Sequence, residues 1–174
     1  MKILTIANKK EEKILRKKTA DFDPALLKDK KRRGEIDEIL KKIKETMVKA
    51  NGVGLAANQI GLDMQVFIAR IPELEKEEII DWNFYVIFNP KITEFSKEKN
   101  IDEEGCLSVP GIYGSVERFS KIIIAGQDKN GKKIKFKADG LLSRIFQHEI
   151  DHLNGILFID KAKNLHKAEI VKNL

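Results

Sequence analysis

Segment 147–152 reads Gln-His-Glu-Ile-Asp-His and places two imidazoles four residues apart on either side of a glutamate. On an α-helix, residues four apart lie on the same face, about 6 Å apart along the axis. Two imidazoles at that spacing can bind one metal ion, and the carboxylate between them can move a proton beside it. The spacing therefore predicts a metal centre at His148 and His152, with Glu149 as its acid–base group.

The residues around this segment predict that it is helical. Apolar side chains recur at steps of three and four through the run, and no proline interrupts it. These side chains are Leu141, Leu142, Ile145, Phe146 and Leu153. Asp139 is the expected N-cap and Gly155 the expected C-terminal cap.

A catalytic metal site usually has three protein ligands and leaves one position for water, so a third ligand is needed. Cys106, the sole cysteine, is the first candidate, although a lone cysteine is often a small buried residue. Glu169 is the second, and with it the site would be that of a zinc endopeptidase. His166 is the third, in a setting that looks solvent-exposed. Phe158 occupies the position of the third histidine of the metzincin proteases and excludes that class. Thiolate with two imidazoles suits zinc, iron, cobalt or nickel.

The second chemical motif is the small-residue segment 52–59, which reads Gly-Val-Gly-Leu-Ala-Ala-Asn-Gln. It matches a loosened dinucleotide fingerprint, but a predicted helix precedes it and a predicted strand follows, which is the reverse of the required order. It could also be a tight turn in which two backbones approach. A third interpretation fits better: a peptide lies against the bare backbone as an added strand, and Gln59 offers an amide donor to a carbonyl oxygen.

The composition is that of a globular protein, with 174 residues, 42% hydrophobic and 34% charged. The length predicts a single domain over residues 1–174. No apolar run is long enough to span a membrane, and no secretory signal is recognisable, so we expect a cytoplasmic protein. A single cysteine excludes an internal disulfide. The net charge of +6 favours polyanions in general, but nothing predicts sequence-specific nucleic-acid binding.

Three helices besides the metal helix are expected. Asp23-Pro24 is a helix-start signal, and the basic run at 30–34 is expected to break that helix. A long N-terminal amphipathic helix then follows, with Ile36, Ile39, Leu40, Ile43, Met47 and Ala50 on one stripe, and it ends at Asn51-Gly52. A short polar helix is expected to run to residue 174.

The strands are expected between these helices. Residues 65–69 form a buried strand, 72–83 an acidic loop, and 84–95 a strand or strand pair. Residues 121–125 and 133–137 form a hairpin around Asn130-Gly131. Helices and antiparallel strands are segregated along the chain, so the predicted fold class is α+β.

Three motifs together resemble the signature motifs of the peptide deformylases: segments 52–59, 104–108 (Glu-Gly-Cys-Leu-Ser) and 147–152. They occur in the family's order, and the similarity extends to 110–113, 116–118 and 138–142. The resemblance implies an enzyme that removes the formyl group from the N-terminal formylmethionine of new polypeptides. It also implies the family's α+β fold, with antiparallel sheets around the metal helix.

The resemblance also implies a role for individual residues. Cys106, His148 and His152 would be the metal ligands, for ferrous iron as the native ion with zinc, nickel or cobalt as substitutes. Glu149 would be the general acid and base.

For the substrate, the resemblance implies that Gln59 and the backbone N–H of Leu107 hold the developing oxyanion, and that Gly54 contacts the substrate backbone. We expect Leu142 and Ile145 to line a methionine pocket. The expected partners are N-formylmethionyl nascent peptides and the ribosome surface, which the basic run at 28–33 could contact. The alternatives are the zinc endopeptidase using Glu169 and a ribosome-associated binding protein with a structural metal.

Overall fold

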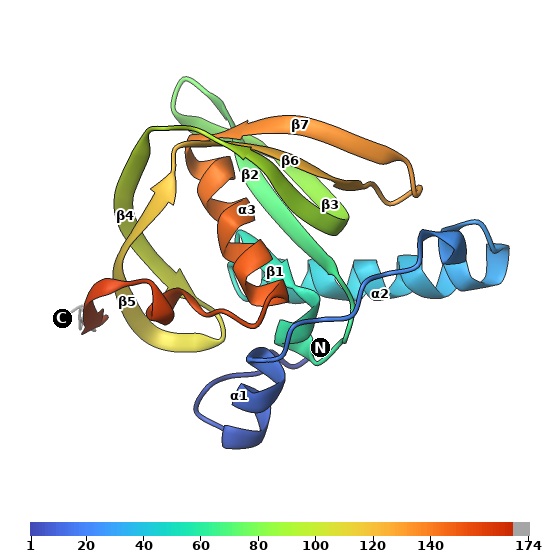
Figure 1. Cartoon of the computed structure of the whole chain (residues 1–174), viewed down its shortest axis with the longest axis horizontal. Helices are drawn as coiled ribbons and strands as arrows, with labels where there is room; N and C mark the ends of the chain where they lie inside the picture. Colours follow the sequence, from blue (N-terminus) through green and yellow to red (C-terminus); the bar gives the residue numbers. More distant parts are fainter. Residues whose placement is uncertain (169–174) are drawn as a thin grey trace.

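The computed structural model describes residues 1–168 (Figure 1). In this part of the chain, antiparallel strands form two sheets and helices pack against them. The helices are α1 (Lys9–Leu15), α2 (Lys30–Lys49) and α3 (Gly140–Leu153), with short 3-10 helices η1 (Pro24–Leu27), η2 (Ala57–Ile60) and η3 (Phe158–Asp160). The strands are β1 (Gly54–Ala56), β2 (Val66–Glu75), β3 (Glu78–Phe95), β4 (Lys99–Cys106), β5 (Val109–Phe119), β6 (Lys121–Gln127), β7 (Lys133–Asp139) and β8 (Lys163–Lys167).

All strand pairs in this part of the chain are antiparallel, which confirms the predicted α+β class. One sheet has the order β1-β2-β3-β6-β7 and the other the order β4-β5-β8. Side chains alternate between the two faces of a strand, so one sheet can support two layers. Leu55 and Ile68 pack under α2, whereas Ala56 and Phe67 pack under α3. The five-stranded sheet therefore lies between the two long helices.

Helix α3 runs through the middle of the molecule, with the five-stranded sheet on one side and β4 and β5 on the other (Figure 1). Phe146 anchors it, with its ring 5.3 Å from that of Phe67 and 5.4 Å from that of Tyr85. Asp139 occupies the N-cap position but its side chain makes no capping hydrogen bond. Gly155, with φ 76°, follows the helix in the left-handed conformation that favours glycine.

Helix α2 begins earlier than the sequence predicts, because the basic run does not break it. The Asp29 side chain accepts a hydrogen bond of 2.8 Å from the Arg32 backbone N–H and caps the helix. Gly34 is exposed within the helix and is tolerated at a cost of about 1 kcal/mol relative to alanine. The predicted apolar stripe is confirmed and packs on the sheet. Asn51, with φ 55°, ends the helix where predicted.

The acidic segment 72–83 is a hairpin and not the loop that the sequence predicts. Strands β2 and β3 pair out to Glu75 and Glu78. Lys76 (φ 48°) and Glu77 (φ 71°) form the two-residue turn in left-handed conformations. The hairpin extends beyond the other strands, so its residues are exposed and their polarity hides the strand pattern.

The two ends of the chain also differ from expectation. Residues 1–20 contain α1, where no helix is predicted, and its first N–H groups are capped by the Asn8 side chain. The expected C-terminal polar helix is instead η3 followed by β8, which pairs with β5. The rest of that predicted helix, residues 169–174, lies outside the described residues. The hairpin predicted around Asn130-Gly131 is confirmed as β6 and β7.

Candidate metal centre and peptide-binding cleft

Strand β4 and helix α3 bring the three expected ligands together. Cys106 is the last residue of β4, and His148 and His152 lie one turn apart on α3. The Cys106 Sγ lies 3.1 Å from His152 Nε2, which lies 3.2 Å from His148 Nε2. The three ligand atoms all lie within 4.8 Å of one another. The end of the strand therefore places the thiol beside the Nε2 atoms of both histidines.

The geometry of these groups fits a divalent metal ion. Two nitrogens bound to one tetrahedral ion at about 2.0–2.1 Å lie about 3.4 Å apart, close to the spacing seen here. The Nδ1 of His148 lies 2.9 Å from the Glu104 carboxylate, which fixes the ring and leaves Nε2 free for the ion. A thiolate and two imidazoles are ligands that suit zinc, iron, cobalt or nickel.

The charges around the cluster also favour a cation. Burial lowers the pKa of His148, but its hydrogen bonds to Cys106 and Glu104 outweigh this and raise it to about 10. Burial and the neighbouring His148 charge lower the pKa of His152 well below its usual value, so this ring stays neutral. Without a metal, the cluster therefore binds a proton at His148. A metal cation would occupy the same position.

A buried ionic network that the sequence analysis missed supports the first histidine. Glu104 accepts hydrogen bonds from Arg118 Nε and Nη2 (both 2.9 Å), from Arg144 Nη1 (2.7 Å) and from His148. Arg118 also donates to Asp151, on α3 between the two histidines. The only signal for this network was that Glu104 and Arg118 fall inside the family-like segments.

Glu149 lies beside the cluster in an apolar setting. It is 3% exposed, and its Oε2 has no hydrogen-bond partner among residues 1–168. Burial raises the pKa of this carboxyl to about 7. A Cβ built on Gly54 would lie 2.1 Å from Glu149 Oε1, so only glycine leaves room for the carboxylate at this position.

The Gln59 side chain is oriented by the backbone of Ala56. Its Oε1 accepts a hydrogen bond of 2.8 Å from the Ala56 N–H, so the amide NH₂ must point the other way. That group lies 3.6 Å from Cys106 Sγ and 3.1 Å from Ser108 Oγ. Leu107 lies in the two-residue turn between β4 and β5. Gln59 and Leu107 therefore border the metal ligands from two sides.

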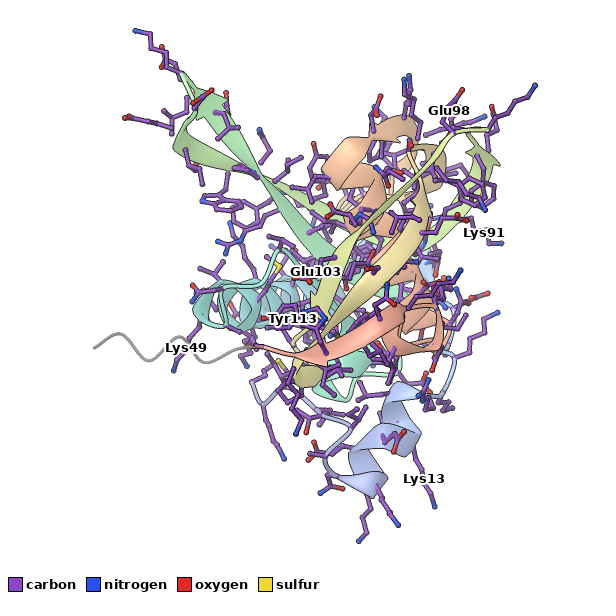
Figure 2. All side chains as sticks on the ribbon, turned by 90° about the vertical axis from the view of Figure 1, so that its left-hand side faces the viewer. Lys13, Lys49, Lys91, Glu98, Glu103 and Tyr113 are labelled. Atoms are coloured by element: carbon purple, nitrogen blue, oxygen red, sulfur yellow. The ribbon has the colours of Figure 1, made fainter. Side chains whose placement is uncertain are left out.

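A cleft of about 550 Å³ opens over the centre. Residues 50–54 form one wall and residues 103–113 the other, and Leu141 and Ile145 of α3 also line it. Ile145 lines the cleft, as a residue of the expected methionine pocket must, whereas Leu142 packs against the core and the half-exposed Leu141 lines the cleft instead. Figure 2 faces the side of the molecule on which Glu103 and Tyr113, two lining residues, lie close together.

Strand β1 offers this cleft an open backbone edge. It is the end strand of its sheet, with β2 on one side only. The Arg70 N–H donates to the Val53 carbonyl (2.8 Å), so Val53 faces β2. Peptide groups alternate in direction along an antiparallel strand, so the N–H and C=O of Gly54 point away from β2. This edge can take up a further strand.

Of the two other proposed ligands, His166 lies outside the cluster. His166 is exposed on β8, with its Nε2 3.1 Å from a carboxylate oxygen of Glu103. Glu169 lies outside the described residues. A larger cavity of about 790 Å³ lies between residues 89–92 and 133–135 and is lined by none of the expected site residues.

A family model described as polypeptide deformylase matches residues 1–168. The chain belongs to the peptide deformylase family. It therefore carries the family's hydrolase activity on formylated peptides, and the family's dependence on metal agrees with the cluster.

Individual deformylases are similar over most of the chain. The peptide deformylase of Pelotomaculum thermopropionicum is 48% identical over 132 residues, which is 76% of this chain and 79% of that relative. The crystal structure of a probable peptide deformylase from synechococcus phage S-SSM7 has a TM-score of 0.76 at 39% identity and covers 92% of this chain and 99% of its own. The Met-Ala-Ser-bound class I type b deformylase of Acinetobacter baumannii has a TM-score of 0.80 at 32% identity and covers 92% of this chain and 97% of its own.

Among residues 1–168, no helix combines the length and the apolarity that crossing a membrane requires.

Proposed function

We propose that this deformylase hydrolyses the formyl amide of N-formylmethionyl nascent peptides at the centre formed by Cys106, His148 and His152. One observation carries the proposal: the three ligand atoms converge beside a buried carboxyl, Glu149, at the open edge of β1. The ligands, the acid–base group and the substrate edge thus meet in one cleft.

Cys106, His148 and His152 would hold a divalent ion, which would lower the pKa of a bound water from 15.7 toward about 7 and so provide hydroxide at neutral pH. The ligand types admit several metals, and we propose ferrous iron as the native ion, following the family resemblance, with zinc, nickel or cobalt as substitutes.

Glu149 would move the proton. A carboxyl with a pKa of about 7 can accept a proton from water and return it to the departing amine at neutral pH. Its Oε2 has no protein donor, so the group is free to take that proton.

Gln59 and the backbone N–H of Leu107 would donate to the oxyanion that forms on the formyl oxygen. The Gln59 amide is neutral and is already oriented by its bond to the Ala56 N–H, so it needs little reorganisation. Loss of one such donor typically lowers kcat by about 10²–10³.

The open edge of β1 would bind the substrate backbone through the peptide groups of Gly54. The methionine side chain would lie against Leu141 and Ile145. The solved relative bound to Met-Ala-Ser supports a peptide in this cleft.

The setting of the reaction follows from its substrate. Formylated chains leave the ribosome in the cytoplasm, so we propose that the enzyme works there and that its basic run at 28–33 contacts the ribosome surface. The family match over residues 1–168 supports one catalytic domain spanning 1–174.

Two alternatives are not favoured. An endopeptidase with Glu169 as the third ligand has little support, because Cys106 fills that place and the family match is to deformylases. A binding protein with a structural metal would leave without a purpose the buried Glu149, whose Oε2 has no hydrogen-bond partner within residues 1–168.

The test is formate release from formyl-Met-Ala-Ser by anaerobically purified protein, with metal analysis. We expect one equivalent of bound metal and rapid formate release. Cys106→Ser should lose both metal and activity, whereas the matched control His166→Gln should keep both. Absence of formate with iron, zinc, nickel and cobalt alike would refute the proposal.

A further inference from the structure

The positive charge of the chain is concentrated in two short segments. Residues 28–33 carry five cations and one anion, and residues 128–133 carry three cations and one anion, for a net charge of +6. The whole chain also has a net charge of +6, so the remaining residues balance to zero. A charge this localised calls for an explanation other than general solubility.

The fold places these two segments together. The Arg33 Nη2 donates to the Asn130 side chain at 2.7 Å, which links the first turn of α2 to the β6–β7 turn. A Cβ built on Gly131 would lie 3.5 Å from Leu27 Cδ1, so the turn also rests on η1. In Figure 1, the tip of the β6–β7 hairpin lies above the end of α2 that is remote from β1. We call residues 28–33 and 128–133 together the basic surface.

The two acidic residues of the basic surface, Asp29 and Asp128, accept hydrogen bonds from backbone N–H groups. The Asp29 carboxylate caps α2 through the Arg32 N–H, and the Asp128 carboxylate accepts from the N–H groups of Asn130 (2.8 Å) and Lys132 (2.9 Å). The side chains of Lys30, Lys31 and Lys132 are exposed. Arg32 and Arg33 pair with Glu35 (3.1 Å) and Asp37 (3.8 Å) in the next turn of α2. Within residues 1–168, the exposed lysines are therefore the cations of this surface that remain open to an external partner.

The placement of these cations opposes the field of the helix. A helix N-terminus has a partial positive charge and favours acidic residues, yet the first turn of α2 contains none. An external polyanion would relieve this repulsion.

A groove with aromatic walls adjoins the basic surface. It has a volume of about 410 Å³ between α2 and the β3–β6–β7 part of the sheet. Lys44, Lys129 and Asn130 line it together with three aromatic rings, those of Phe84, Tyr85 and Phe136. The Lys44 Nζ lies 3.6 Å from the centre of the Phe84 ring, which is 37% exposed. Phe84 is the exposed ring of the groove, whereas Tyr85 and Phe136 are partly buried. A cation beside an accessible ring is a combination that binds unpaired nucleotides.

We propose that the basic surface and this groove form a sequence-independent RNA-binding site. The cations would contact phosphates, and the groove would admit an unpaired base. The choice of RNA as the polyanion rests on the proposed function, because the substrate is made on an RNA particle. Helix α2 joins this site to the cleft: its first turn lies in the basic surface, and Ala50, its C-cap, lines the cleft about 30 Å away.

The test measures binding of a labelled 20-nucleotide oligouridine by fluorescence anisotropy. Three or four phosphate contacts would weaken binding by about 20- to 50-fold between 50 and 200 mM salt. The variant Lys30→Glu/Lys31→Glu/Lys132→Glu should reduce affinity at least tenfold. Glutamates in the first turn suit the helix field, so the variant should fold.

The matched control is Lys9→Glu/Lys10→Glu/Lys13→Glu, which makes the same charge change on α1. These lysines are exposed and lie far from the β6–β7 turn, as the labelled Lys13 shows at the foot of Figure 2. We expect this control to bind RNA within about twofold of the parent chain. An equal loss in both triple variants, or no RNA binding by the parent at 50 mM salt, would overturn the proposal.

Two further measurements separate the alternatives. Phe84→Ser should weaken binding of oligouridine but not of an RNA duplex. If this variant and the parent chain bound oligouridine with equal affinity, the proposed role of the groove would be overturned. Binding to phosphatidylglycerol vesicles without binding to RNA would overturn the choice of partner. Formate release from formyl-Met-Ala-Ser should be unchanged in the surface triple variant, so a failed deformylase assay and a failed RNA assay are distinguishable.

Discussion

Glu104 and Glu149 both lie near His148, but their surroundings shift the pKa values of the two carboxyl groups in opposite directions. Burial alone would raise the pKa of Glu104, but hydrogen bonds from Arg118 and His148 hold it well below its usual value. Glu149 has the same burial without these donors, and its pKa rises to about 7. When the surroundings of two carboxyl groups move their pKa values apart in this way, the difference indicates which group stays ionised and which one can exchange a proton. Glu104 stays ionised and orients His148, whereas Glu149 can exchange a proton.

The raised pKa of Glu149 predicts a pH-dependent stability in the metal-free protein. Its ordinary value is 4.5, so its stabilising contribution is complete below pH 4.5 and is lost as the pH rises through about 7. Glutamine does not titrate, so Glu149→Gln should gain up to about 3 kcal/mol relative to the parent chain between pH 4.5 and 8. Urea unfolding after chelation, at pH 5 and pH 8, measures this. A difference between the two proteins that is independent of pH would contradict it.

At the scale of elements, one arginine ties together the parts that form the centre. Arg118 on β5 bonds to Glu104 on β4 and to Asp151 on α3, and all three side chains are largely buried. The metal ligands lie on these same elements, at the end of β4 and along α3. The network therefore sets the distance between the thiol and the imidazoles.

Arg118→Met should be strongly destabilising, because it leaves two buried carboxylates without their shared partner. We expect a loss of about 3–5 kcal/mol in the free energy of unfolding. The control Arg32→Met removes an exposed pair with Glu35 (3.1 Å) and should cost about 1 kcal/mol or less. Thermal or urea unfolding of both variants provides the measurement, and comparable losses would show that the network adds nothing.

The sequence predicted elements whose signal is local and missed those that depend on distant partners. The helix of His148 was predictable because its apolar spacing and its ligand spacing coincide. The start of α2 was not, because the basic run at 30–34 was interpreted as a break and the cap at Asp29 was not recognised. The ion pair of Glu104 and Arg118 depends on the β4–β5 register, which no local pattern contains. Leu142 and Leu141 are adjacent, and only the packing of α3 decides which one faces the cleft.

At the scale of the molecule, a metal would join elements that are distant in the sequence. Cys106 and His148 are separated by β5, β6 and β7, so an ion bound by both would hold β4 and α3 together. A ligand that binds only the folded state stabilises it in proportion to its affinity.

Chelation should therefore lower the melting temperature of the metal-loaded protein. At a metal concentration 1,000 times Kd, the expected stabilisation is about 4 kcal/mol. Differential scanning calorimetry with and without a chelator measures the shift, and Cys106→Ser should show a much smaller one. An unchanged melting temperature of the parent chain after complete metal removal would contradict the three-ligand site.

The wall of the cleft formed by Gly52, Val53 and Gly54 presents main chain and few functional groups. A surface of this kind can bind only the repeating amide groups that all polypeptides share. It does not distinguish the side chains beyond the first residue. Such indifference suits an enzyme that must process nearly every protein its cell begins to make. If the proposed substrate lies along this wall, selectivity for its side chains would have to come from the other residues that line the cleft, such as Leu107, Tyr113 and Ile145.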